Sequence, residues 1–393
     1  MARPDFPMFD ADNHFYEPQD CFTRHIDPKS RDQAIRFVTD GPEPTVVIGD
    51  KPYTYGAVYT DRCPRPGSLI EFLKTLKKGA QGYASAMDQD MPMAFQDRDA
   101  RLAMMDEQGV ESTIMLPTLG VTVEHFMRDD IEKTYANLEA FNRFVGEDWG
   151  FAYQDRIFGV AMLSLLDRDR GVAELERVLA QGARIIHLVA GPQGRRSPAD
   201  PYFDPFWARV AEANAVVAFH SSESGYNELY STVWGEEPNP KPFEQSAFQW
   251  MNCFGDRPII ETLTSLIFMN LFDRFPTLRV ASIEHGSIWV RYILESIDKK
   301  KGMGRNGPWP GGRLTRRPSE IFREHVYVAP FPEDDVPALI ELLGKERVLG
   351  GSDFPHPEGM SQPEDFFGLV QGESAEVQRL VMRDNARRLL GLH

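Results

Sequence analysis

Short apolar segments rich in Val and Ile alternate with amphipathic segments of helical length along most of this chain. Such an alternation is typical of repeated β-strand–α-helix units. Several of the short segments are apolar on both faces, as expected of parallel strands buried beneath helices. Eight segments are expected to form strands: 8–14, 111–117, 156–163, 183–189, 215–221, 279–285, 325–331 and 347–353.

Helix-like segments lie between and after these strands, and some of them end at a Gly or before a Pro, which are common helix stops. They are 97–109, 130–150, 168–182, 205–215, 258–276, 287–302, 334–344 and 374–391. The pattern predicts an α/β fold, a (β/α)8 TIM barrel that forms a single domain over residues 1–393. In such a barrel the active site lies at the carboxyl ends of the strands.

Two long segments interrupt the alternation. Residues 15–96 follow the first expected strand, and residues 222–257 follow the fifth. Both are too long to be ordinary connections between a strand and a helix. Because each leaves the carboxyl end of a strand, we expect both insertions to form lid or interface elements.

The charge balance and the cysteine content narrow the class of protein. The chain has 43 Lys and Arg against 59 Asp and Glu, a formal net charge of -16, which argues against nucleic acid as a partner. Its 3 cysteines are widely separated, so a disulfide framework or a zinc ribbon is improbable. The sequence has no apolar run long enough for a membrane span or a signal peptide, and we expect a cytoplasmic enzyme with a small-molecule substrate.

Imidazole and carboxylate side chains stand at or near the carboxyl ends of five of the expected strands. They are Asp12, His14, His187, His220, His285 and Asp353. Asp12 and His14 are two residues apart, so in an extended strand both point to the same face. Nitrogen and oxygen donors that meet on rigid supports at one end of a barrel are what a metal site requires.

The motifs DADNHFYEP, FHSSE, IEHGS and GSDFPHPEG, taken in this order, resemble those of the amidohydrolase superfamily. The resemblance covers most of the chain and is nearest to amidohydrolase family 2, the branch that contains aminocarboxymuconate semialdehyde decarboxylase. It implies that His14, His220 and Asp353 bind a metal ion. It also implies that His285 is a catalytic acid/base or a ligand of a second metal.

Two departures from the usual pattern of that branch affect the expected metal content. Asp12 stands where the first-strand pair more often has a His, and a further carboxylate favours Mn or Fe over Zn. His187 stands on the fourth strand, where mononuclear decarboxylases generally have no ligand, and indicates a second metal. The whole donor set resembles the dinuclear oxygenase offshoot of the superfamily, which includes 2-aminoisobutyrate hydroxylase.

We therefore expect a dinuclear oxygenase, with Fe or both Mn and Fe, that hydroxylates a small amine- or carboxylate-bearing substrate. The alternative is a hydrolase or non-oxidative decarboxylase with Mn or Zn, in which His285 moves protons and Asp353 orients the water or substrate. A degenerate, inactive barrel is disfavoured because all the donor positions keep ligating residue types. We expect a homo-oligomer, or a hetero-oligomer with a homologous barrel subunit.

Residues close to these donors are further candidates. Glu17 lies three residues after His14 and is a candidate ligand, and His356 lies three residues after Asp353 and is a candidate catalytic residue. Each of the two is also a candidate to be a metal ligand, a hydrogen-bond partner of a ligand or a substrate contact. Asp10 precedes Asp12 on the same strand face and is expected either to hydrogen-bond a ligand or to be a buried structural carboxylate.

Three other features have two interpretations each. Glu284 is next to His285 in the expected strand, so we expect its side chain to face the helices rather than the site. The aromatic residues of the second insertion line either a substrate pocket or a subunit interface. Arg62 and Arg65 are candidates to bind a substrate carboxylate, although surface arginines are the commoner case.

Overall fold

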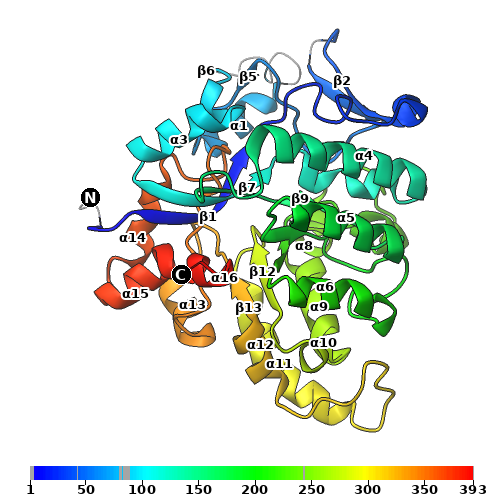
Figure 1. Cartoon of the computed structure of the whole chain (residues 1–393), viewed down its shortest axis with the longest axis vertical. Helices are drawn as coiled ribbons and strands as arrows, with labels where there is room; N and C mark the ends of the chain where they lie inside the picture. Colours follow the sequence, from blue (N-terminus) through cyan, green and yellow to red (C-terminus); the bar gives the residue numbers. More distant parts are fainter. Residues whose placement is uncertain (1–3, 42, 79–81, 83–88, 242–243, 393) are drawn as a thin grey trace.

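Parallel strands form the centre of the protein, and helices surround them (Figure 1). The structure is a computed structural model that describes residues 4–41, 43–78, 82, 89–241 and 244–392. One sheet has the strand order β1-β7-β8 and a second has the order β13-β12-β11-β10-β9. These strands are β1 (Met8–Phe15), β7 (Val110–Pro117), β8 (Ile157–Gly159), β9 (Ala161–Met162), β10 (Ile185–His187), β11 (Val216–His220), β12 (Arg279–Ile283) and β13 (Val326–Val328).

The two parallel sheets meet in the segment that was expected to be the third strand. β8 and β9 are separated only by Val160, whose N–H donates to the carbonyl of Met115 in β7. Each of these residues is buried, as expected of a strand that is covered on both faces. One stretch of chain therefore belongs to both sheets.

The segment expected to be the eighth strand forms no named strand, but it lies between β13 and β1. Val348 pairs with Val328, and Phe354 pairs with Asn13, in isolated parallel bridges. The N–H of Ala11 also donates to the carbonyl of Gly350 at 2.9 Å. The other expected strands are confirmed, and together they make a mixed α/β fold.

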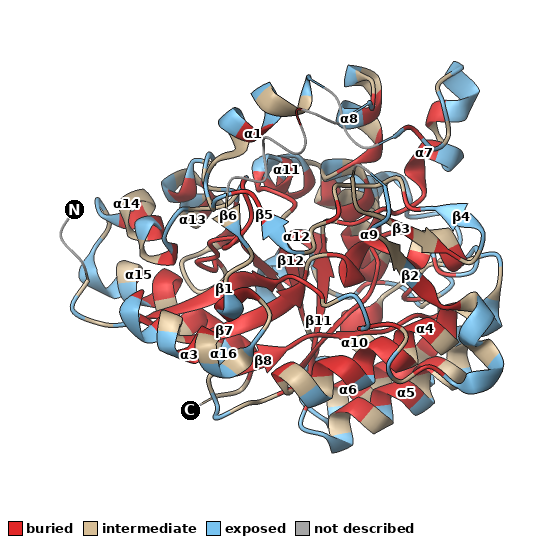
Figure 2. Ribbon diagram, turned by 90° about the horizontal axis from the view of Figure 1, so that it is seen from above, coloured by how far each residue is buried: buried red, intermediate tan, exposed pale blue. Residues whose placement is uncertain are grey.

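The helices cover the strands with their apolar sides and leave their polar sides in solvent (Figure 2). They are α3 (Arg98–Glu107), α4 (Ile131–Phe144), α5 (Arg168–Ala180), α6 (Asp204–Glu212), α9 (Asp256–Phe268), α10 (Leu271–Arg274), α11 (Ile288–Met303), α12 (Pro318–His325), α13 (Val336–Leu343), α14 (Phe367–Val370), α15 (Ala375–Arg379) and α16 (Asn385–Leu389). The side chains of Asp97, Asp130 and Asp167 accept N–H bonds in the first turns of α3, α4 and α5, so these helices begin at N-caps. Within the described ranges, each helix is too short or too polar to cross a bilayer.

Shorter helical turns complete the connections. Single π-helical turns at Val145–Trp149 and Leu380–Asp384 extend α4 and join α15 to α16. Turns of 3-10 helix lie at η1 (Pro28–Gln33), η2 (Met93–Phe95), η3 (Gly120–Thr122), η4 (Glu124–Met127), η6 (Pro201–Phe203), η7 (Ser231–Trp234) and η8 (Pro363–Phe366).

Both insertions carry secondary structure of their own. The first contains β2 (Ile35–Val38), β3 (Thr45–Ile48), β4 (Lys51–Pro52), β5 (Arg62–Cys63), β6 (Gln89–Asp90) and α1 (Leu69–Leu76). The second contains α7 (Tyr226–Leu229) and α8 (Ala247–Cys253). Strands β2, β3 and β4 form an antiparallel sheet, and β5 pairs with β6.

The buried carboxylate of Asp10 joins β1 to the segment that precedes Asp353. One of its oxygens accepts the N–H of Ser352 at 2.9 Å and that of Asp12 at 3.2 Å. The other accepts the hydroxyl of Ser352 and the side-chain amide of Asn13. Burial raises the pKa of Asp10 to about 6. Asp10 therefore fixes the relative position of two segments from opposite ends of the chain.

Arg101 of α3 also holds the end of β1 in place. Its fully buried guanidinium donates to the carbonyls of Ala94 and His14 and to the side chain of Asn13. Burial lowers the pKa of Arg101 to about 9. The last turn of the first insertion and the end of β1 are consequently held by one side chain.

Replacing Asp10 by Ala tests its structural role. The Asp10→Ala variant is expected to lose about 3 kcal/mol of unfolding free energy, because buried donors lose their acceptor. Asp10→Asn retains one acceptor oxygen and is expected to lose less. Urea unfolding of the metal-free variants measures both values, and equal stability of Asp10→Ala and the parent protein would contradict this role.

Candidate metal centre

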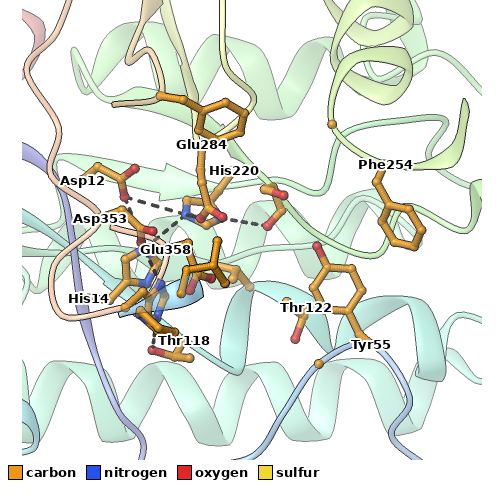
Figure 3. Close-up of a pocket in the computed structure, with 18 of the residues that line it drawn as sticks. Asp12, His14, Tyr55, Thr118, Thr122, His220, Phe254, Glu284, Asp353 and Glu358 are labelled. Carbon is orange, nitrogen blue, oxygen red and sulfur yellow. Dashed lines mark hydrogen bonds and ion pairs between the residues drawn. The ribbon is translucent and has the colours of Figure 1, made fainter. Parts of the chain in front are cut away.

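A cavity of about 530 Å3 opens where β1, β11 and β12 end. Asp12, His14, His220, Glu284 and Asp353 lie together on one side of it (Figure 3). The strands bring these five residues together from distant parts of the sequence. The predicted convergence of His14, His220 and Asp353 is therefore what the structure shows.

The hydrogen bonds of the two imidazoles indicate which ring nitrogens carry protons. Nδ1 of His14 lies 3.2 Å from the carbonyl of Pro117, and Nδ1 of His220 lies 2.8 Å from that of Ser221. A carbonyl only accepts, so each Nδ1 carries the hydrogen. In the neutral rings both Nε2 atoms then present lone pairs, and they face each other at 3.2 Å.

Two carboxylate oxygens complete this group of acceptors. Nε2 of His14 lies 3.2 Å from Oδ1 of Asp12 and 3.5 Å from Oδ1 of Asp353. Nε2 of His220 lies 3.8 Å from the same Asp12 oxygen. Ligand atoms about 2.1 Å from a common metal ion lie about 3.0 Å (adjacent) to about 4.2 Å (opposite) from one another, so the spacing and the chemistry of these donors fit a divalent cation.

The pKa shifts of His14 and His220 reflect the burial of these rings and the acceptors that crowd around them. Burial and the neighbouring His356 lower the pKa of His14 to about 4, so this ring is neutral near pH 7. Burial opposes a charge on His220, yet the Glu284 and Asp12 carboxylates raise its pKa well above the usual value. A proton on His220 and a bound cation are thus alternative ways to hold these carboxylates together.

Asp353 is oriented by His356. Nδ1 of His356 lies 2.7 Å from Oδ1 of Asp353, and its Nε2 lies 2.8 Å from the hydroxyl of Thr118. Burial, together with Glu284 and Glu358, raises the pKa of Asp353 well above its usual value. Because both nitrogens of His356 have partners, its geometry favours positioning Asp353 over binding the metal itself.

Glu284 lines the cavity, and the expectation that it faces the helices is wrong. β12 ends at Ile283, so the alternation of a strand does not continue to Glu284. Its carboxylate lies 2.8 Å from Nε2 of His220. Together with His14, Asp353 and His356, Glu284 forms a second group whose ligand atoms lie close enough to hold a metal.

Glu284 and Asp353 share an uncommon backbone conformation. Both have a φ of 55°, in the left-handed region that glycine prefers. A non-glycine residue there costs about 1 kcal/mol or more, and such residues concentrate at functional sites. The chain uses this conformation to turn both carboxylates into the cavity.

Glu17 lies outside both ligand groups. Its Oε1 atom accepts the N–H groups of Leu119 and Gly120, where the chain leaves β7. Burial raises the pKa of Glu17 to about 7. Metal ligation by Glu17 stays a prediction. The two N–H bonds to its Oε1 atom do not favour it, because that oxygen is already engaged.

His187 and His285 are buried but also lie outside both groups. Nδ1 of His285 lies 3.3 Å from the hydroxyl of Ser282, and its side chain does not line the described cavity. Nε2 of His187 has no hydrogen-bond partner among the described residues. Ligation of a second metal by His187 or His285 stays a prediction, because no distance between the described residues tests it.

The insertions supply the opposite wall of the cavity. Tyr55 from the first insertion and Phe254 from the second lie on the side away from the candidate ligands (Figure 3). Their ring centroids are 5.9 Å apart. Arg62 and Arg65 do not line the cavity. Both are exposed and pair with Asp90 and Glu71, respectively.

Gly351 offers a test of the metal centre that spares every ligand. A Cβ atom at Gly351 would lie 2.6 Å from Cβ of Asp12. We expect Gly351→Ala to displace Asp12 and to weaken Mn²⁺ binding about tenfold. Titration calorimetry measures the affinity, and Gly372→Ala is the matched control because nothing lies within 4 Å of the added methyl. Equal Mn²⁺ affinity of both variants would show that Asp12 does not bind the ion.

Comparison with solved structures places this site in a known fold. The structure of an amidohydrolase from Mycobacterium avium subsp. paratuberculosis is 37% identical, with a TM-score of 0.86, over 98% of this chain and 100% of that chain. The 5-carboxyvanillate decarboxylase of Sphingomonas paucimobilis is 18% identical, with a TM-score of 0.64, over 99% and 100%. A dihydroxybenzoic acid decarboxylase from a Polaromonas species, with bound manganese and the inhibitor 2-nitroresorcinol, is 18% identical, with a TM-score of 0.61, over 98% and 97%.

The two decarboxylases are too distant in sequence to show more than the fold. None of the curated proteins compared with the chain matches it. The family model described as amidohydrolase matches residues 9–392. The chain therefore belongs to the amidohydrolase family.

Proposed function

We propose that this protein is a metal-dependent, non-oxidative decarboxylase of small carboxylic acids. The observation that carries the proposal is the pair of Nε2 lone pairs of His14 and His220, 3.2 Å apart, with two carboxylate oxygens beside them. A divalent cation among these acceptors would be coordinated by all of them. The likeness to decarboxylase structures, one of them with manganese, supports the choice of reaction.

We propose one Mn²⁺ ion, held by Asp12, His14, His220 and Asp353. Both ligand groups include His14, so they overlap in one small volume. Two carboxylates favour a harder ion than Zn²⁺. The expectation of two metals depended on His187 together with Asp12, and His187 belongs to neither of these groups.

A bound divalent cation supplies a Lewis acid that polarises an oxygen of the substrate. The residues of the chain supply the rest of the site. Glu284 lies in the cavity beside His220, so it is better placed than His285 to move a proton at the reacting end of a substrate. Tyr55 and Phe254 line the opposite side of the cavity, where their rings would pack against an apolar part of the substrate.

We also propose a closed barrel and two lids around the site. The eight parallel segments would form a closed (β/α)8 barrel, and segments 15–96 and 222–257 would act as lids. The hydrogen bonds that Gly350 and Leu349 make to Ala11 and Val328 support closure through the eighth segment. Wall residues from both insertions support the lids. Association with a second subunit stays a prediction.

The expected oxygenase reaction is less well supported than its alternative. It relied on a dinuclear centre, and the ligand groups do not require a second ion. The related structures named above are an amidohydrolase and two decarboxylases. We therefore favour chemistry that does not consume dioxygen.

Release of CO2 under anaerobic conditions tests the proposed reaction. The Mn²⁺-loaded protein is incubated with hydroxybenzoic acids, 2,6-dihydroxybenzoate first, and the CO2 and the decarboxylated phenol are quantified. Turnover is expected without dioxygen, is expected to stop with a chelator, and is expected to fall by a factor of about 100 or more in His220→Ala. Strict dependence on dioxygen would overturn the proposal.

The role of Glu284 is tested by comparing it with its neighbour. Glu284→Gln keeps the size of the side chain but loses its charge, and we expect kcat to fall about 100-fold with Mn²⁺ content unchanged. His285→Gln is expected to have a smaller effect, because this side chain does not line the described cavity. A larger loss of kcat in His285→Gln would return the acid/base role to His285.

A further inference from the structure

Six side chains that line the cavity are carboxylates, whereas no Lys or Arg lines it in the described part of the chain. The carboxylates are Asp12, Asp256, Glu284, Glu333, Asp353 and Glu358. One divalent cation offsets only two of these formal charges. The rest of the cavity would therefore repel a substrate that carries additional negative charge.

Three of these carboxylates, Asp256, Glu333 and Glu358, are exposed at the cavity. Glu358, after burial and Glu284, raises the pKa of Asp353 at the metal-binding end. Asp12 and Asp353 are buried at the metal-binding end, whereas Asp256 and Glu333 are exposed. Asp256 begins α9 and Glu333 follows β13, so separate elements bring these charges to the opening. Burial and the nearby Asp334 raise the pKa of Asp256, which is consistent with crowding of acids there.

Arginines from the surrounding segments are engaged elsewhere. Arg62 and Arg65 pair with carboxylates outside the cavity. The guanidinium of Arg257, next to Asp256, lies over the ring of Tyr230 at 4.4 Å from its centroid. None of these three lines the cavity, so none is placed to bind a second carboxylate of a substrate.

Aromatic rings form much of the remaining wall. Tyr55, Trp250, Phe254 and Phe331 line the cavity, and the centroids of Trp250 and Phe254 are 4.9 Å apart. The faces of such rings attract cations as well as apolar groups. Aromatic rings beside carboxylates make a wall that suits an amine or a neutral group.

We propose that the cavity selects substrates with a single anionic group, the carboxylate that meets the metal. The body of the substrate would be aromatic or apolar, and its far end would be neutral or cationic, in particular an amine. This inference rests on the proposed function, because it assumes that a carboxylate binds at the metal. A second carboxylate at the far end would face Asp256 and Glu333 without a cation to receive it.

Three benzoates with a neutral, a cationic or an anionic far end test this selection. Benzoate, 4-(aminomethyl)benzoate and benzene-1,4-dicarboxylate are titrated into the Mn²⁺-loaded protein and their affinities are measured by calorimetry. We expect the amine to bind at least as tightly as benzoate. We expect the dicarboxylate to bind about tenfold more weakly, because like charges meet in the cavity.

A double variant tests whether the carboxylates at the opening cause the selection. In Asp256→Asn/Glu333→Gln the ratio of amine to dicarboxylate affinity is expected to shrink to about threefold, since neutral amides repel no anion. Glu341→Gln is the matched control, because Glu341 is exposed on α13 and does not line the described cavity. The control is expected to keep the ratio of the parent protein.

The outcomes separate this inference from the proposed function. Equal or tighter binding of the dicarboxylate, an unchanged ratio in the double variant, or failure of all three compounds to bind would overturn the charge selection. The decarboxylase proposal would still be judged by release of CO2. Conversely, preference for the amine with no release of CO2 from any acid would leave the selection standing and overturn the reaction.

Discussion

The hydrogen bonds of the Asp10 carboxylate hold together the two ends of the chain that form the candidate metal centre. Asp12 and His14 follow Asp10 in β1, whereas Asp353 follows Ser352 more than three hundred residues later. Asp10 accepts hydrogen bonds from both segments, from the N–H of Asp12 and from the N–H and hydroxyl of Ser352. The proposed ligands are therefore held in position by the protein itself, and an ion would meet donors that need little rearrangement.

The strands and the convergence of several candidate ligands could be predicted because they depend on local pattern. Apolar segments with Val and Ile predicted the strands, and strand ends predicted the positions of His14, His220 and Asp353. The eighth segment was harder, because Gly350, Gly351 and the turn at Asp353 interrupt the regular ladder after a single bridge to β13. A strand pattern in sequence says where an extended segment lies but not whether its hydrogen bonds are regular.

The direction of a side chain just past the end of a strand could not be predicted from the sequence. Neighbouring residues face opposite sides of a sheet only while the chain stays extended. β12 ends at Ile283, so the rule does not apply to Glu284. A positive φ at Gly286 shows how sharply the chain turns there. The choice between two metals and one had the same weakness, since it depended on the direction in which His187 points. The absence of basic residues from the described cavity wall likewise appears only in three dimensions.

The left-handed backbone at Glu284 and Asp353 has a consequence for how this site could be lost. Glycine or asparagine would adopt that conformation with less strain, so either substitution would relax the local backbone while removing a carboxylate from the cavity. Selection for thermal tolerance alone would consequently drive these positions away from acidic residues. In a stabilised descendant of this protein that kept its fold but lost its reactivity, substitutions would be expected first at Glu284 and Asp353.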